Sequence, residues 1–152
     1  MRKRTRSREF ALQLLYERDV VSTELDEAME DFWEDRSDLA LSNAEKMSLE
    51  DDKKEPEVRE YTERLVRGVA EKLSAIDEII ERFAENWEID RMACVDRNIL
   101  RLGAYEMLYI PEIPMKVAIN EAVELAKRYG EADSSKFVNG ILDRIGKMEC
   151  KK

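Results

Sequence analysis

The scarcity of chain-breaking residues is the feature that most constrains what this sequence can fold into. Its 152 residues include only five glycines and three prolines, whereas folds built from many short strands need turn signals at short, regular intervals. Hydrophobic residues make up 43% of the chain, which is enough for a sizeable core and too much for a disordered protein. The sequence therefore predicts a few long α-helices with charged outer faces.

Apolar residues recur at helical spacing along most of the chain. About seven helices are expected, and they cover residues 7–20, 23–34, 56–73, 74–87, 90–110, 114–129 and 134–148. Residues 37–55 lose this periodicity and are dense in charge, so we expect a long acidic loop there, with room for one short helical turn. The fold class is all-α, with residues 1–8 as a basic arm and two small helical subdomains at 9–74 and 75–148.

Local signals set the expected helix ends. Ser7 can cap the first helix, while Thr23-x-x-Asp26 and Ser74-x-x-Asp77 have the form of capping boxes. Gly130 is expected to end the sixth helix in a left-handed conformation. In the first helix, Phe10, Leu14 and Val21 share the apolar face, and Tyr16 lies away from it.

The net charge of −9 is unevenly distributed. Residues 22–60 contain 15 acidic and 5 basic residues, whereas residues 2–8, the basic segment, contain five basic residues and no acidic one. The basic segment is either a disordered solubilising tail or a nucleic-acid contact that becomes ordered on binding. Arginine outnumbers lysine in it by four to one, and because the guanidinium binds phosphate through two donors, nucleic acid is the sharper hypothesis.

Missing residue types exclude several classes of site. The chain contains no histidine, so it has no histidine base, catalytic triad or histidine metal ligand. Its two cysteines, Cys94 and Cys150, are too few for a zinc knuckle, and its glycines do not have the spacing of a phosphate-binding loop. No apolar run is long enough to span a membrane, and no signal core follows the basic segment. We expect no cofactor, no metal and a cytoplasmic location.

The region from Lys116 to Ile145 contains residues that helix packing alone does not explain. Asn139 and Gly140 lie inside a predicted helix, where both residue types are unfavourable. Phe137 stands beside Lys136 at a helix start, where its ring could stack on an unpaired base or pack in the core. Both roles stay open on the residues alone.

Three segments carry a resemblance to a known family. The first runs from Arg8 to Tyr16, the second from Asp96 to Glu106, and the third from Ile113 to Asp143, with the runs VAINEAVELAK and KFVNGILD. Together they resemble the NusB family of bacterial transcription antitermination factors. The resemblance covers nearly the whole chain, and only residues 35–56 have no strong counterpart.

The resemblance implies an all-α protein of two helical subdomains that is not an enzyme. Members of the family pair with NusE, a small-subunit ribosomal protein, and the pair binds the boxA element of nascent ribosomal RNA transcripts. Together with other Nus factors they help RNA polymerase to resist termination. The resemblance therefore implies RNA and protein partners and no membrane.

Site residues follow from the resemblance by position. RNA contacts in the family come from the arginine-rich N-terminus and from the region around the last helix. The matching positions here are Arg4, Arg6, Arg8, Arg101, Asp133, Lys136 and Phe137. The NusE-facing surface corresponds to Tyr16 and Asp96. The register of the arginines on RNA stays open, as does the choice between monomer and homodimer in the free state.

Two other functions also stay open at this point. The same domain resembles the N-terminal RNA-binding module of bacterial ribosomal RNA cytosine methyltransferases, which need a separate cofactor-binding domain and a catalytic cysteine. Because no such domain follows before Lys152, we expect a protein that is not an enzyme. The third alternative is a purely protein-binding helical module, which a boxA binding assay separates from the RNA-binding function.

Overall fold

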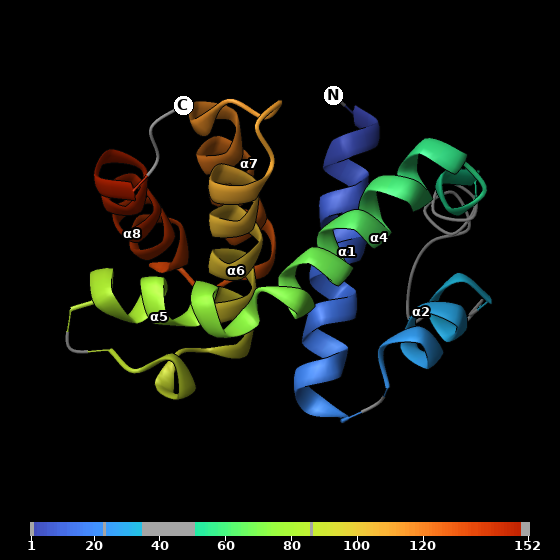
Figure 1. Ribbon diagram of the computed structural model, residues 1–152, viewed down its shortest axis with the longest axis horizontal. Helices are drawn as coiled ribbons and strands as arrows, with labels where there is room; N and C mark the ends of the chain where they lie inside the picture. The colour runs from blue at the N-terminus through green and yellow to red at the C-terminus, as the bar shows by residue number, and fades with distance from the viewer. Residues whose placement is uncertain (1, 23, 35–50, 86, 150–152) are drawn as a thin grey trace. The chain divides into compact units, whose positions relative to one another are not determined.

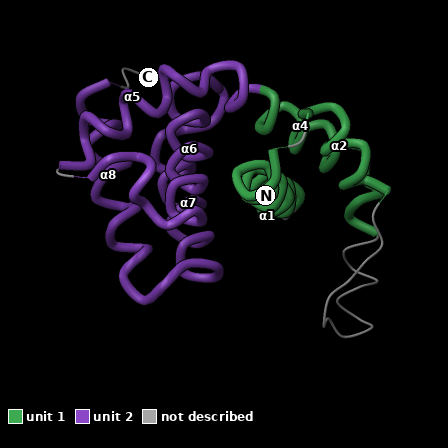
Figure 2. The backbone as a smooth tube through the Cα atoms, turned by 90° about the horizontal axis from the view of Figure 1, so that it is seen from below, with its two compact units in different colours: residues 1–67 green, residues 68–152 purple. Residues whose placement is uncertain are grey.

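The computed structural model describes residues 2–22, 24–34, 51–85 and 87–149. These ranges contain α-helices, one short 3-10 helix and no strand, so the predicted all-α class is confirmed. The chain divides into two compact units, Met1–Arg67 and Gly68–Lys152, which are green and purple in Figure 2. The division falls within a helix, ahead of the boundary that we expected after residue 74.

Unit 1 is held together by an aromatic cluster and a polar seam. Its helices are α1 (Arg2–Val20), α2 (Leu25–Glu34) and most of α4 (Pro56–Glu71) (Figure 1). Phe10 of α1 meets Phe32 and Trp33 of α2 edge to face, with ring centroids 5.3 and 5.9 Å away. Such pairs contribute about 0.5–1.5 kcal/mol beyond the burial of their area. The polar seam is the hydrogen-bonded contact between α1 and α4, in which the buried Ser7 hydroxyl donates to the Val58 carbonyl at 2.9 Å.

Unit 2 is built around α6, which contacts α5, α7 and α8. Its elements are α5 (Leu73–Phe83), η1 (Ile89–Arg91), α6 (Cys94–Tyr109), α7 (Met115–Tyr129) and α8 (Ser134–Glu149). Every residue of α6 from Asn98 to Ala104 is buried. A Cβ added at Gly103 would lie 2.6 Å from Leu142 of α8 and 3.3 Å from Ala122 of α7. Glycine therefore lets α6 approach both neighbours closely.

The first helix begins earlier than expected, because the basic segment is itself helical. α1 starts at Arg2, and Ser7 is an interior residue whose hydroxyl also donates to the Lys3 carbonyl at 3.1 Å. The expected Ser7 cap is therefore wrong. At the other end of α1, Val21 is 60% exposed and Tyr16 is 41% exposed. The exposure predicted for Tyr16 is confirmed, and the core position of Val21 is not.

Two other predicted capping features are also wrong, although α7 ends at Tyr129 next to Gly130, as expected. α5 starts at Leu73 with no side-chain cap, because the Asp77 carboxylate of the expected capping box is engaged by Arg101. Gly130 has φ −95° and ψ −174°, which is extended backbone and not the left-handed conformation. Next to it, the Glu131 amide donates to the Ser134 hydroxyl at 2.9 Å, which ties the connection to the start of α8.

The expected acidic loop is described only at its end. Residues 35–50 lie outside the described ranges, and so does Thr23 of the other capping box. Residues 51–53 are helical, and Asp52 is buried. The Lys53 ammonium donates to the Phe32 carbonyl at 3.0 Å. This part of the expected loop is therefore folded onto unit 1.

Candidate nucleic-acid interface

Acidic groups of unit 1 compensate the charges of the basic segment. The Arg6 guanidinium donates to Asp52 at 2.7 Å and to Glu9 at 2.9 Å. Lys3 lies 3.6 Å from both Glu55 and Glu57. Cations at a helix N-terminus oppose the helix dipole, so these acids offset an unfavourable arrangement. The flexible arm that we expected at residues 1–8 is thus wrong for the described residues, which form an ordered helix.

The three predicted arginines of this segment differ in exposure. The Arg4 guanidinium lies 4.7 Å from the centroid of the Tyr61 ring, and Arg4 and Arg6 are both partly exposed. Arg8 is only 2% exposed, and its guanidinium is 5.8 Å from the same ring. Phosphate can therefore reach Arg4 and Arg6 directly, whereas Arg8 faces the interior of unit 1. RNA binding by all three stays a prediction.

Arg101 is committed to packing within unit 2. Its guanidinium forms a two-point ion pair with Asp77, at 2.8 and 2.9 Å, and also donates to Asn98 at 3.1 Å. The side chain is 9% exposed. Such fork-to-carboxylate geometry fixes α5 to α6. Contact with RNA, predicted from the resemblance, remains untested, and the present geometry turns the arginine inward.

The remaining predicted RNA contacts gather at the start of α8. Asp133 and Lys136 are exposed, and Phe137 is partly buried. The Phe137 ring meets Trp87 edge to face, with centroids 5.9 Å apart and planes at 72°. Trp87 is 50% exposed and follows α5. We expected Trp87 to end a helix, and sequence reasoning did not assign it to the site because it is distant from Phe137 along the chain.

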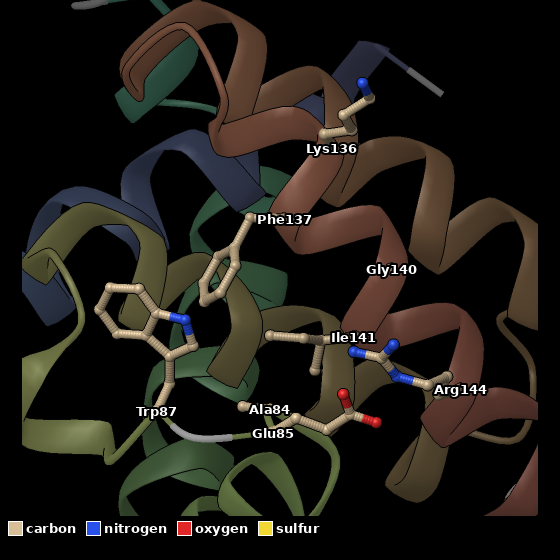
Figure 3. Close-up of a pocket in the computed structure, with 8 residues that line it drawn as sticks. All are labelled: Ala84, Glu85, Trp87, Lys136, Phe137, Gly140, Ile141 and Arg144. Carbon is tan, nitrogen blue, oxygen red and sulfur yellow. The ribbon is translucent and has the colours of Figure 1, made fainter.

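Phe137 and Trp87 line a cavity of about 280 Å³, which we call the ring cavity (Figure 3). Its lining residues are Ala84, Glu85, Trp87, Lys136, Phe137, Gly140, Ile141 and Arg144. All of them belong to unit 2. The four residues 137, 140, 141 and 144 stand three or four apart on α8, so they share one face of the helix. This helical spacing is the feature of the sequence that places Arg144 on the same face as Phe137.

The two predicted partner-binding residues have distinct surroundings. Tyr16 presents an exposed ring on α1. Asp96 lies in the first turn of α6, where the helix dipole favours a carboxylate. Its Oδ1 atom is buried, and it accepts no hydrogen bond from the residues that the structure describes. A buried acceptor without a donor costs free energy, so the carboxylate of Asp96 is unfavourably placed in the position described.

Two other kinds of feature, a metal site and a membrane-spanning helix, are not found among the described residues. Within it, no three acidic or cysteine side chains come together in a way that could hold a metal ion. None of its helices combines the length and apolar character needed to cross a membrane.

Comparison with known proteins gives the family. The model of the NusB family matches residues 5–147. The transcription antitermination protein NusB of Myxococcus xanthus is 45% identical over 145 residues, which is 95% of each chain. The Bacillus subtilis protein of the same name is 43% identical over 143 residues, or 94% of each chain. The chain belongs to the NusB family, whose relatives are named as antitermination proteins and not as enzymes.

Solved structures agree with this assignment. A structure of Thermotoga maritima NusB covers 97% of this chain and 93% of its own, with a TM-score of 0.77 at 37% identity. A structure of the antitermination factors NusB and NusE in complex with double-stranded RNA covers 97% of this chain and 98% of its own. Its TM-score is 0.79 at 30% identity. The similarity thus extends over both units.

Proposed function

We propose that this protein is a transcription antitermination factor that binds the boxA element of nascent ribosomal RNA transcripts together with NusE. Similarity to NusB proteins over nearly the whole chain carries the proposal. The relative solved with NusE and RNA supports both kinds of partner. On this proposal the protein acts in the cytoplasm, and with other Nus factors it helps RNA polymerase to resist termination.

Two kinds of RNA contact follow from the described geometry. Arg4 and Arg6 are charged and partly exposed, so they would contact phosphates and supply affinity without much choice of sequence. Phe137 would stack on a base. Asp133 repels phosphate, so it would contact RNA by accepting a hydrogen bond from a base amino or imino group. Lys136 is exposed beside Phe137 and would contact a phosphate.

Arg8 and Arg101 take a different place in the proposal. Both are buried, and the Arg101 guanidinium already donates hydrogen bonds to Asp77 and Asn98. The two arginines would therefore stabilise the packing of their units. Direct contact of Arg101 with RNA would require it to exchange these hydrogen bonds for contacts with RNA.

NusE binding is proposed for Tyr16 and Asp96. An exposed tyrosine is a common anchor of protein interfaces, because its large ring orders at little entropic cost. The Oδ1 atom of Asp96 is shielded from solvent and has no donor among the described residues. The carboxylate would therefore have to turn outward to accept a hydrogen bond from NusE, and its Oδ1 atom would give up no hydrogen bond to a described residue in doing so.

The test is a titration of boxA RNA and of a scrambled RNA of the same composition, at fixed salt, with and without NusE. We expect weak binding by the protein alone, because the basic segment is short and acids compensate its charges. Binding of boxA should tighten when NusE is present. Equal affinities in both series would contradict the cooperative proposal. Failure to bind RNA in either series would favour a purely protein-binding module.

A further inference from the structure

Gly140 is a glycine that packing does not explain. A Cβ added at Gly140 would meet no heavy atom within 4 Å, whereas one at Gly103 or Gly146 would lie within 2.6 Å of a neighbour. Glycine in a helix interior is destabilising relative to alanine. Glycine therefore makes α8 less stable than alanine would at this position, although a side chain would fit there.

The space that Gly140 leaves open belongs to the ring cavity (Figure 3). Its volume of about 280 Å³ lies just below the roughly 300–1,000 Å³ typical of small-ligand sites. One planar ring system suits this space better than a larger ligand. The exposed half of Trp87 supplies an apolar wall, and Phe137 braces the indole edge to face.

Polar groups stand at one end of the ring cavity. The Arg144 guanidinium donates to the Phe83 carbonyl at 3.0 Å, which fixes the position of its planar fork. In Figure 3 the Glu85 carboxylate and this guanidinium lie at the same end of the ring cavity, whereas the Lys136 ammonium points away from the two rings. A carboxylate accepts from base amino and imino groups, and a guanidinium donates to base carbonyl and ring nitrogen atoms.

We propose that the ring cavity holds one unpaired nucleobase of the bound RNA, stacked on Trp87 above Gly140. The base edge faces Glu85 and Arg144, and Lys136 contacts an adjacent phosphate. This inference rests on the proposed RNA-binding function and deepens it. It adds Trp87, the space at Gly140 and the two edge contacts to the stacking role of Phe137.

Filling the ring cavity without damaging the fold is the direct test. Gly140→Leu replaces glycine with a good helix former and extends a side chain into open space, so its melting temperature should equal or exceed that of the wild type. Its affinity for boxA RNA in the presence of NusE should fall about 5- to 100-fold, as expected for the loss of one stacked base. The salt dependence of binding should not change, because no phosphate contact is lost.

The matched control is Ser74→Leu. Ser74 is exposed on α5 and lies outside the ring cavity. This variant adds the same side chain to a helix surface of unit 2, so its RNA affinity should equal that of the wild type. Trp87→Ala should reproduce the loss seen with Gly140→Leu.

Changes to the RNA identify the base. Each nucleotide of boxA is replaced in turn by an abasic residue. One replacement should weaken binding of the wild type by the same factor as Gly140→Leu, and the variant should be insensitive to that replacement. The fluorescence of Trp87 is a second measure of base binding. The chain has two tryptophans, so one substitution leaves Trp87 as the single indole that fluoresces. In a Trp33→Phe variant, RNA should change the fluorescence of Trp87, and the abasic replacement at that position should abolish the change.

The outcomes separate this inference from the proposed function. No binding of RNA by the wild type would overturn both. Binding by the wild type with equal affinity for Gly140→Leu would overturn the inference alone. Loss of NusE binding by Gly140→Leu, with RNA binding intact, would also overturn it, because the ring cavity would then receive a protein side chain.

Discussion

The basic segment of unit 1 and the ring cavity of unit 2 offer an RNA opposite kinds of surface. In the basic segment, Arg6 is held by two carboxylates, and Lys3 lies near two more. A phosphate approaching them must compete with these acids. In the ring cavity, the half-exposed Trp87 offers an apolar aromatic surface, and the charged side chains of Glu85 and Arg144 stand at one end of it. A base that stacks on the indole does not have to displace a carboxylate from a cation.

The two surfaces should therefore contribute differently to the affinity for RNA and to the discrimination between RNA sequences. Exposed ion pairs contribute little net free energy and weaken as salt is added. The gain for each phosphate bound by the basic segment should therefore be small and dependent on salt. Stacking on an aromatic ring neutralises no phosphate and releases no counterion, so it should add little to the salt dependence. We expect measurements at two ionic strengths to assign a variant to one region or the other.

The largest effect should come from Arg101 of unit 2, which is buried in an ion pair, unlike the partly exposed Arg4 and Arg6 of the basic segment. Arg101→Ala removes a buried partner of Asp77 and leaves the carboxylate unpaired, which should cost about 3–5 kcal/mol of stability. Thermal and denaturant unfolding measure the loss. Arg101→Lys keeps the charge and loses the two-point geometry, so its stability should lie between those of the wild type and of Arg101→Ala. Unchanged stability with weaker RNA binding would instead show that Arg101 contacts RNA.

The next effect concerns whether NusE contacts both units. Tyr16→Ala alters unit 1 and Asp96→Lys alters unit 2. If both are central contacts, each should weaken the NusE complex by about 2 kcal/mol or more, measured by calorimetry with melting curves as the control for folding. A loss with only one of them would confine NusE to that unit. No loss with either would remove the proposed surface.

A smaller effect is expected when the basic segment loses its two accessible arginines. Arg4→Ala with Arg6→Ala should reduce the slope of log affinity against log salt by up to about one unit per lost phosphate contact. Affinity for boxA and for scrambled RNA should fall alike. Phe137→Ala is the comparison from unit 2, because it should weaken binding and leave the slope unchanged. Unequal losses for the two RNAs would assign base recognition to the arginines.

The sequence predicted the helices well because their apolar spacing is a local property. It predicted the chemistry of the basic segment less well, because the acids that order it come partly from residues 52–57, far along the chain. Arg8 illustrates the limit. A run of arginines at a chain end is typical of an exposed arm, and nothing in the run itself predicts that Arg8 is 2% exposed.

The ring cavity also combines residues that local sequence pattern can group with one that it cannot. The residues from α8 could be grouped in advance, since positions 137, 140, 141 and 144 share a helical face. Trp87 could not, because its contact with Phe137 depends on how α5 and α8 pack in unit 2. Local pattern was therefore sufficient to group one wall of the ring cavity, although only Lys136 and Phe137 were predicted as site residues, and tertiary structure supplied the other wall.

The smallest effect has the opposite sign and tests the compensation directly. Asp52→Asn keeps the shape of the side chain and removes the charge that holds Arg6 at 2.7 Å. Of the two carboxylates that hold the Arg6 guanidinium, only Glu9 then still competes with phosphate. RNA affinity should therefore rise a few-fold at low salt, and the gain should fade as salt screens the contact. Asp26→Asn is the matched control, since it removes the same charge from an ion pair of unit 1 with Arg67. An equal gain in the control would mean that overall charge is responsible. No gain in either variant would mean that Arg6 does not contact phosphate, and the electrostatic half of the comparison would then rest on Arg4 alone.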